Sequence, residues 1–133
     1  MKIIIHSDGG ARGNPGPAGI GAVLHDEQGV LLAEVSRFIG HTTNNQAEYQ
    51  ALLAGLEQAL ILGADQVECF LDSELVVKQI NREYKVKHKE LAPLFLAVYN
   101  LLTKFKSYRF VHVPRAQNEE ADRLANEAMD KGV

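Results

Sequence analysis

The chain has 133 residues, of which 46% are hydrophobic and 23% are charged. These are the proportions of an ordinary globular domain, so disordered and fibrous classes are excluded. The apolar runs are only a few residues long, which excludes a membrane-spanning segment. The first strand turns polar at His6 and Ser7, too early for a signal peptide. A single cysteine, Cys69, excludes an internal disulfide and a cysteine-built zinc site. We therefore expect one cytoplasmic domain over residues 1–133, with no membrane contact.

The net charge of the chain is −3, from 14 Lys and Arg against 17 Asp and Glu. Taken as an average, this argues against a nucleic-acid binder, because such domains are usually basic. The average hides any local concentration of charge. Acidic groups gathered around metal ions would leave the remaining surface more positive.

Apolar runs and alternating patterns predict five strands. They cover residues 2–7, 18–26, 30–39, 66–71 and 108–113. The first contains Ile3-Ile4-Ile5 without alternation, as is typical of a strand buried on both faces. A glycine- and proline-rich loop, residues 9–17, follows it, and residues 27–29 predict a hairpin turn.

Four helices separate or follow these strands. The first begins at Asn44 or Asn45, runs to about Leu62 and ends at Gly63. Ser73 can cap a short helix that ends at Ile80, and Asn118 can cap the last helix, which runs to about Asp130. Residues 90–105 carry one apolar stripe, formed by Leu91, Leu94, Phe95, Val98, Leu101, Leu102 and Phe105.

The resulting order, βββαβααβα, predicts an α/β fold with a five-stranded mixed sheet flanked by helices. The first three strands form an antiparallel meander. A right-handed helical crossover then places strand four parallel to strand one.

Asp8 and Asp72 follow two apolar strands that we expect to be neighbours. In open α/β sheets, the crevice at the carboxyl ends of the strands is the usual binding place. Either aspartate alone is equally consistent with a turn or helix cap, but the pair at one switch point indicates a site.

Glu48 projects from the apolar stripe of the first long helix, which also contains Leu52, Gly55, Leu56 and Ala59. A surface glutamate would lie on the opposite face. A buried, unpaired carboxylate costs several kcal/mol, so Glu48 needs a cation or a shifted pKa. The alternative interpretation is a carboxylate that stabilises the helix dipole.

Asp122 lies in the first turn of the last helix, where acidic residues are common. Together, Asp8, Glu48, Asp72 and Asp122 would form a site with oxygen ligands only. Such ligands suit Mg²⁺ or Mn²⁺ and disfavour zinc. Two such ions are an established device for in-line displacement at a phosphodiester.

Two polar segments and one basic segment have alternative interpretations. Asn14 lies in the glycine-rich loop, which is either a plain turn or a close approach to a ligand. Residues 42–46 form either a helix cap or a phosphate-attracting helix N-terminus. Residues 82–89, with Lys85, Lys87 and Lys89, form either a solvated loop or a polyanion-binding lobe. Without the four carboxylates, the remaining chain would carry a net charge of +1.

Four segments resemble the signature segments of ribonuclease HI. They are Asp8-Gly9-Gly10-Ala11-Arg12-Gly13-Asn14-Pro15-Gly16, Thr43-Asn44-Asn45-Gln46-Ala47-Glu48, Leu71-Asp72-Ser73 and Asn118-Glu119-Glu120-Ala121-Asp122-Arg123-Leu124-Ala125. They occur in the order of that family and span the whole chain.

The resemblance implies an endonuclease that cuts the RNA strand of RNA–DNA hybrids and leaves 5′-phosphate and 3′-hydroxyl ends. It implies that Asp8, Glu48, Asp72 and Asp122 hold two Mg²⁺ ions, for which Mn²⁺ can substitute. By the same matching, Thr43 would hold a DNA phosphate, and the hybrid minor groove would be read by Asn14, Asn44 and Asn45.

The chain departs from that family at three places. The basic segment 82–89 is short and the chain has no tryptophan, whereas well-known bacterial members have a longer handle with tryptophans. The loop before Asp122 lacks the histidine of many members, so Arg115 is our candidate for its phosphate or product-release role. We expect His112 to belong to the preceding strand. Glu74 replaces a neutral groove-contacting residue, and we assign it no contact.

Two other classes of protein remain as alternatives. A strand transferase or a junction-resolving nuclease could use a similar acidic site, usually in a longer chain. A non-catalytic hybrid-binding module would keep the groove residues and lose a carboxylate, whereas all four are present here. We expect a monomer, because no long apolar surface stripe is left over.

Overall fold

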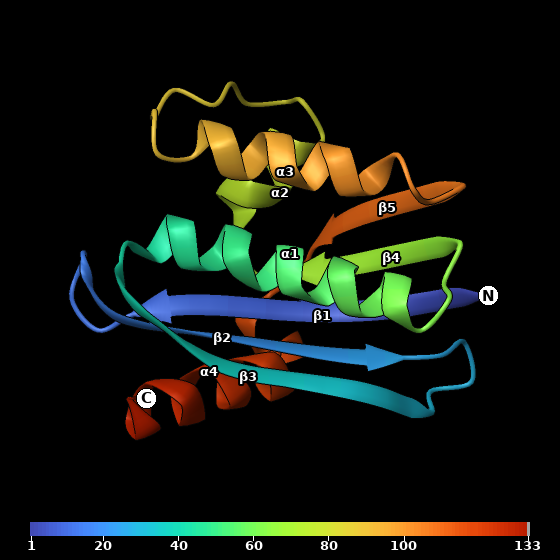
Figure 1. Cartoon of the computed structure of the whole chain (residues 1–133), viewed down its shortest axis with the longest axis horizontal. Helices are drawn as coiled ribbons and strands as arrows, with labels where there is room; N and C mark the ends of the chain where they lie inside the picture. The colour runs from blue at the N-terminus through green and yellow to red at the C-terminus, as the bar shows by residue number, and fades with distance from the viewer. Residues whose placement is uncertain (133) are drawn as a thin grey trace.

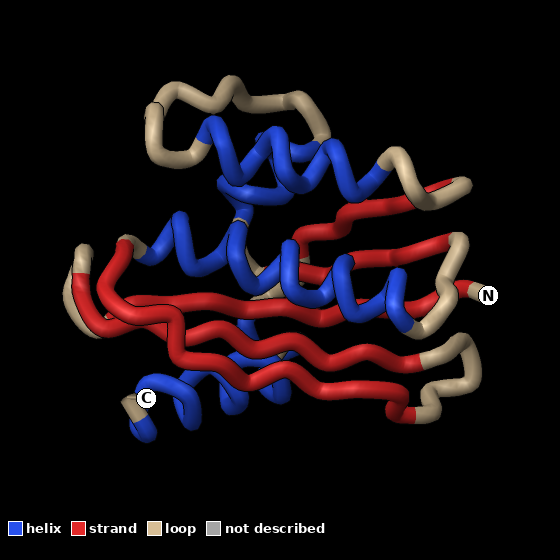
Figure 2. The backbone as a smooth tube through the Cα atoms, viewed as in Figure 1, coloured by secondary structure: helices blue, strands red, loops and turns tan. Residues whose placement is uncertain are grey.

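The computed structural model describes residues 1–132. Within them, the strands are β1 (Lys2–Ala11), β2 (Gly16–His25), β3 (Leu31–Thr42), β4 (Gln66–Leu71) and β5 (Ser107–His112). The helices are α1 (Asn44–Ile61), α2 (Glu74–Ile80), α3 (Ala92–Leu102) and α4 (Glu119–Lys131), with a 3₁₀ turn, η1 (Arg115–Gln117), before α4. Figure 2 shows the helices, the strands and the loops that join them. None of the described helices is both long and apolar enough to cross a bilayer.

All five strands belong to one sheet in the order β3-β2-β1-β4-β5 (Figure 1). β1 is antiparallel to β2 and parallel to β4, while β5 is parallel to β4. The predicted five-stranded mixed sheet, with its antiparallel meander and its parallel crossover, is therefore confirmed.

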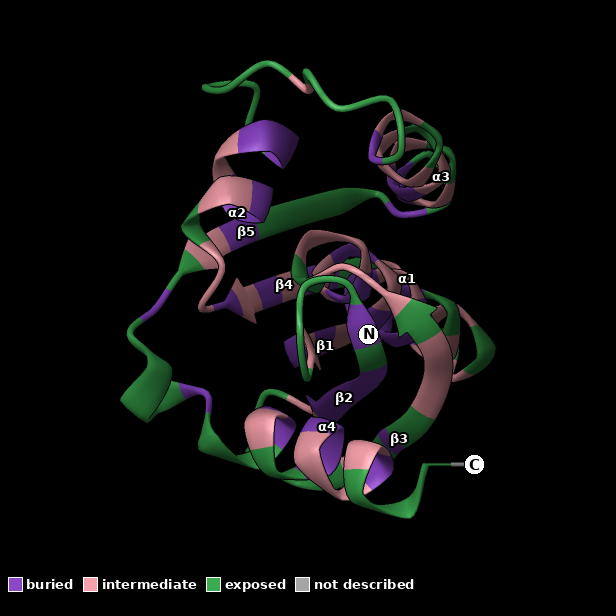
Figure 3. Cartoon of the chain, turned by 90° about the vertical axis from the view of Figure 1, so that its left-hand side faces the viewer, coloured by how far each residue is buried: buried purple, intermediate pink, exposed green. Residues whose placement is uncertain are grey.

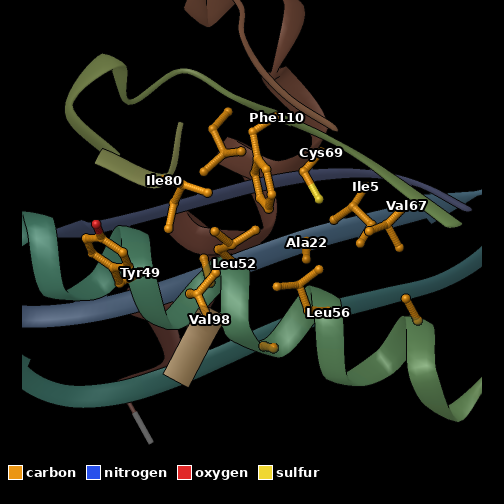
Figure 4. Close-up of a cluster of buried hydrophobic side chains, with 14 of the residues drawn as sticks. Ile5, Ala22, Tyr49, Leu52, Leu56, Val67, Cys69, Ile80, Val98 and Phe110 are labelled. Atoms are coloured by element: carbon orange, nitrogen blue, oxygen red, sulfur yellow. The ribbon is translucent and has the colours of Figure 1, made fainter. Parts of the chain in front are cut away.

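The helices cover both faces of this sheet. α1 packs on one face together with α3, and α4 packs on the other (Figure 3). The main core lies between α1 and the sheet and includes Ile5, Leu52, Leu56 and Phe110, which Figure 4 shows in one cluster. Val98 of α3 is a buried member of the same core, so α3 packs against it with its apolar stripe, as the pattern of residues 90–105 predicts.

The boundaries of β1, β2, β3 and α3 differ from the prediction by two residues or more. β1 continues past residue 7 to Ala11, because Asp8 to Ala11 pair with Gly21 to Ala18 of β2. Asp8 therefore lies within the paired β1 strand, and the unpaired loop is reduced to residues 12–15. The helix predicted over 90–105 is shorter, since α3 begins at Ala92, with a proline in its first turn, and ends at Leu102.

Two of the predicted helix starts are confirmed, those of α1 and α2, and the predicted cap of α4 is wrong. Ser73 caps α2, with its hydroxyl accepting a hydrogen bond from Val76 N at 3.2 Å. The cap of α1 is Thr43, whose side chain forms a reciprocal capping box with Gln46. Asn118 stands at the cap position of α4 but does not cap it. Its Nδ2 donates to Ser7 O at 2.8 Å, which ties the start of α4 to β1.

Candidate active site

Asp8 and Asp72 lie next to each other because of the strand register. β1 and β4 are parallel, and Ser7 paired with Leu71 is the last pair between them. Asp8 and Asp72 are the residues that follow this pair, the first still within β1 and the second just past the end of β4, so their carboxylates meet at the end of this ladder. The juxtaposition predicted from the two strand ends is therefore present, although β1 itself continues beside β2.

Glu48 reaches the same point from α1. The helix crosses β1 at Gly9, where a Cβ atom would lie 2.2 Å from the carbonyl oxygen of Ala47. Only glycine permits this approach, and it places the next helical residue, Glu48, beside Asp8. One carboxylate oxygen from each of Asp8, Glu48 and Asp72 lies within 4.8 Å of the others.

Burial and mutual repulsion disfavour the charged forms of these carboxylates. The pKa of Asp8 is raised to about 8, first by burial and then by the negative charge of Asp72. Burial also raises the pKa of Glu48 well above its usual range, and the charge of Asp8 raises it further. The Oε2 atom of Glu48 is buried and has no hydrogen-bond partner among the described residues. A divalent cation bound among these carboxylates would offset the cost of their burial.

Asp122 joins the site from α4 on the other face of the sheet. α4 approaches β2 at Gly21, where a Cβ atom would lie 2.2 Å from the carbonyl oxygen of Ala121. Asp122 lines a cleft of about 480 Å³ together with Asp8, Glu48 and Asp72. All four predicted carboxylates therefore line one cleft, and those of Asp8, Glu48 and Asp72 lie within 4.8 Å of one another.

Arg115 lies at the rim of this cleft, and His112 does not line it. Arg115 begins η1, and its Nη2 lies 3.4 Å from Asp122 Oδ1, although 77% of its side chain is exposed. His112 is the last residue of β5 and is exposed. The structure therefore places the predicted arginine beside the carboxylates and leaves the histidine on the strand, as expected.

The asparagines join the β1–β2 loop to the start of α1. Asn14 Oδ1 accepts a hydrogen bond from Asn44 N at 3.1 Å, and Asn44 Oδ1 accepts one from Ala11 N at 2.7 Å. Each amide oxygen is therefore turned inward, and each Nδ2 remains available as a donor. The oxygen of the Thr43 side chain already accepts from Gln46 N, and Asn45 is half-buried beside it.

The basic residues Lys85, Lys87 and Lys89 are exposed on the loop between α2 and α3. Figure 1 shows this loop above α1, on the side of the molecule where α1 begins and the β1–β2 loop lies. The three lysines do not line the acidic cleft. They therefore form a separate positive patch beyond the start of α1.

Two polar residues that line the cleft, Arg12 and Asn126, were not predicted as site residues from the sequence. Arg12 lines the cleft, and its Nη2 lies 2.6 Å from Asp130 Oδ1, so the β1–β2 loop is tied to the end of α4. Asn126 also lines the cleft and donates from Nδ2 to the backbone oxygen of Asp122 at 2.9 Å. Helical spacing offers a signal for Asn126, because it lies four residues after Asp122. No pattern in the sequence pairs Arg12 with Asp130.

The fold and the site together define an α/β protein with an all-carboxylate site at the strand ends. Four oxygen-donor side chains, one with an orphaned buried oxygen, fit a divalent metal such as Mg²⁺ or Mn²⁺ and lack the nitrogen and sulfur donors that zinc prefers.

Comparisons with known proteins agree with this class. Residues 6–128 match the family described as reverse transcriptase-like. The chain is 46% identical to a ribonuclease HI of Halobacterium salinarum over 97% of its own length. It also superimposes on LC11-RNase H1 in complex with an RNA/DNA hybrid, with a TM-score of 0.93, 48% identity and 97% of each chain covered. The chain belongs to the ribonuclease H family.

Several relatives are longer than this chain. It is 49% identical to a bifunctional protein of Mycobacterium tuberculosis over 98% of its own length, but it spans only 36% of that protein. It spans 65% of the halobacterial ribonuclease HI. The similarity therefore concerns the ribonuclease H-like part of these longer proteins.

Proposed function

We propose that this chain is an endonuclease that hydrolyses the RNA strand of RNA–DNA hybrids and leaves 5′-phosphate and 3′-hydroxyl ends. The observation that carries the proposal is the gathering of Asp8, Glu48 and Asp72 within 4.8 Å. The raised pKa of Asp8 supports it, because protein folds rarely hold unpaired carboxylates together without a functional reason.

In this proposal, Asp8, Glu48, Asp72 and Asp122 hold two divalent ions, Mg²⁺ or, as a substitute, Mn²⁺. When bound, such ions lower the pKa of the attacking water and stabilise the negative charge on the departing 3′ oxygen. The four carboxylates supply the charge that keeps the ions in place. Arg115, at the rim of the cleft, would attract the scissile phosphate while it forms an ion pair with Asp122.

The polar cluster at the start of α1 would read the hybrid. Asn14 and Asn44 offer amide N–H donors whose orientation is fixed by the inward hydrogen bonds of their oxygens. Such donors suit the 2′-hydroxyl and the base-edge acceptors of the wide minor groove. Asn45 would add a further groove contact, and Thr43 would hold a DNA phosphate. The exposed lysines at positions 85, 87 and 89 would contact phosphates farther along.

Cleavage of a hybrid labelled on both strands tests the proposal, with duplex RNA and duplex DNA as controls. We expect cuts in the RNA strand of the hybrid only, which require Mg²⁺ or Mn²⁺. Glu48→Gln should abolish cutting, whereas Glu57→Gln, an exposed carboxylate on the same helix, should leave it unchanged. Cleavage by Glu48→Gln at the rate of the unmodified chain would contradict the metal-dependent site.

A non-catalytic hybrid-binding module is the second candidate, because the groove residues do not require the carboxylates. It predicts tight hybrid binding without any cut under the same conditions. The complete set of four cleft carboxylates favours hydrolysis over this alternative. The single domain over residues 1–133, the monomeric state and the cytoplasmic location stay predictions.

A further inference from the structure

The acidic cleft continues along α4 beyond the four carboxylates. One face of this helix borders the cleft for about two turns, with the lining residues at helical spacing: Asp122, Ala125, Asn126 and Met129. Arg12, on the β1–β2 loop, also lines the cleft. Figure 1 shows this loop and the end of α4 on the same side of the molecule. The cleft therefore extends from the carboxylates along α4 toward a cationic side chain.

Arg12 and Arg115 are the two cationic side chains that line this cleft within residues 1–132. Arg115 pairs with Asp122 at the start of α4, and Arg12 pairs with Asp130 near its end. The two aspartates are eight residues apart, which is about 12 Å along a helix. This separation exceeds the length of one nucleotide along a duplex axis, about 3.4 Å, so the two arginines face different phosphates of a bound strand.

The guanidinium of Arg12 is held in place but still has donors to offer. Its Nη2 lies 2.6 Å from Asp130 Oδ1 and donates to the backbone oxygen of Asn126 at 3.5 Å. Within the described chain, these contacts leave Nε and Nη1 as available donors. The side chains of Arg12 and Asp130 are 48% and 65% exposed, so water screens the ion pair and its contribution to stability is small. A phosphate can therefore replace Asp130 at little cost.

The backbone around Arg12 is fixed before any ligand arrives. Arg12 N donates to Pro17 O at 2.8 Å, and the neighbouring Ala11 N donates to Asn44 Oδ1 at 2.7 Å. The loop is thereby anchored to β2 and to the start of α1, while the side chain of Arg12 is anchored to α4. A cation that is already positioned loses little conformational freedom when it binds an anion, which favours binding.

We propose that Arg12 is a substrate-binding residue, which contacts a phosphate of the RNA strand away from the scissile one. Asp130 holds the guanidinium until the strand displaces it. This inference rests on the proposed hydrolysis of RNA–DNA hybrids. The phosphate belongs to the RNA strand because Arg12 borders the same cleft as the four carboxylates, which act on that strand. The planar guanidinium suits a phosphate because it can donate two parallel hydrogen bonds.

Hybrid binding and steady-state cleavage by variants of this ion pair test the proposal. Arg12→Ala should raise Kd and KM about three-fold or more and change kcat little, and Arg12→Lys should recover part of the loss. Asp130→Asn should instead tighten binding, because it frees the guanidinium, and this gain should vanish when Arg12→Ala is also present. Arg109→Ala, which removes an exposed arginine paired with Glu68, is the matched control and should bind as the unmodified chain does.

The sign of the Asp130→Asn effect separates a phosphate contact from a structural tie. If the ion pair only holds the loop to α4, both Arg12→Ala and Asp130→Asn should weaken binding alike. That result, or an unchanged Kd and KM in Arg12→Ala, would overturn the proposal. Binding is measured apart from cutting, so an unmodified chain that binds hybrids without cutting them would refute the proposed hydrolysis, and Kd would still test Arg12. A chain that binds no hybrid would refute both.

Hybrids with one uncharged methylphosphonate linkage locate the phosphate. As this linkage is moved along the RNA strand, we expect one position, other than the scissile one, at which the unmodified chain loses about as much affinity as Arg12→Ala does. At that position, Arg12→Ala should lose nothing further, because the partner of the guanidinium is already absent. Such a position on the DNA strand alone, or on neither strand, would refute the assignment.

Discussion

Asp8→Asn should stabilise the metal-free protein, and the gain should grow with pH. The pKa of Asp8 is raised from 3.8 to about 8 by burial and by the charge of Asp72. The folded state therefore keeps a proton between about pH 4 and pH 8 that the unfolded chain has released. Because the folded state binds more protons in this window, its stability falls as the pH rises through it.

The magnitude follows from about 1.36 kcal/mol for each unit of pKa difference. The carboxyl of Asp8 then costs about 1.5 kcal/mol at pH 5 and about 5 kcal/mol at pH 8. An amide of the same shape has no such cost. The packing and hydrogen bonding of the asparagine are independent of pH. The quantity to measure is therefore how much the difference in unfolding free energy between Asp8→Asn and the unmodified chain, called the gap below, changes between pH 5 and pH 8, which should be about 3–4 kcal/mol.

Urea unfolding in EDTA at pH 5 and pH 8 measures this gap, with Glu57→Gln as the control for an exposed carboxylate. Mg²⁺ should then stabilise the unmodified chain and have little effect on Asp8→Asn, because ligand that binds only the folded state adds to its stability. The same variant should lose hybrid cleavage. A gap that does not change with pH, or an unmodified chain that is the more stable protein in EDTA at pH 8, would refute the reasoning.

Three further predictions concern the rim, the basic loop and the backbone. Arg115→Ala should lower turnover several-fold or more with metal binding largely intact, and Arg115→Lys should recover part of the loss. His112→Ala should change turnover little. The reverse pattern in steady-state kinetics would assign the role to the histidine. Gly9→Ala should destabilise the protein by about 1–3 kcal/mol and weaken Mg²⁺ binding, because the added Cβ meets the Ala47 carbonyl. Gly10→Ala, whose Cβ would have no neighbour nearer than 3.8 Å, should be tolerated in both assays. Replacing Lys85, Lys87 and Lys89 with alanine should weaken hybrid binding and reduce the log–log salt slope by about 0.9 for each phosphate that is no longer bound, while saturated turnover changes little.

The sequence predicts the fold and the carboxylates well because both depend on local patterns. Apolar runs locate the strands, and the parallel crossover brings the ends of two of them together, so the sequence alone pairs Asp8 with Asp72. Glu48 is predicted because its helical spacing puts it on the buried stripe. These three residues are the ones that the structure gathers most closely.

Other features depend on contacts between distant segments, and no local pattern reports them. Asn118 has the sequence of an ordinary helix cap, yet its amide bonds to Ser7, which is 111 residues away. Arg12 lies in a loop that suggests flexibility, yet it pairs with Asp130 near the end of the described chain. In each case the local propensity allows several partners, and the packing of α4 on the sheet selects one.

The acidic site also depends on residues that carry no chemistry. Gly9 lets α1 approach one face of the sheet, and Gly21 lets α4 approach the other. These two contacts bring Glu48 and Asp122 from opposite layers toward Asp8, which lies on the strand between them. The backbone thus forces carboxylates together against their mutual repulsion, and the raised pKa of Asp8 shows the cost of that arrangement. A bound divalent cation would offset this cost, so the geometry that destabilises the metal-free protein is also the geometry that favours metal binding.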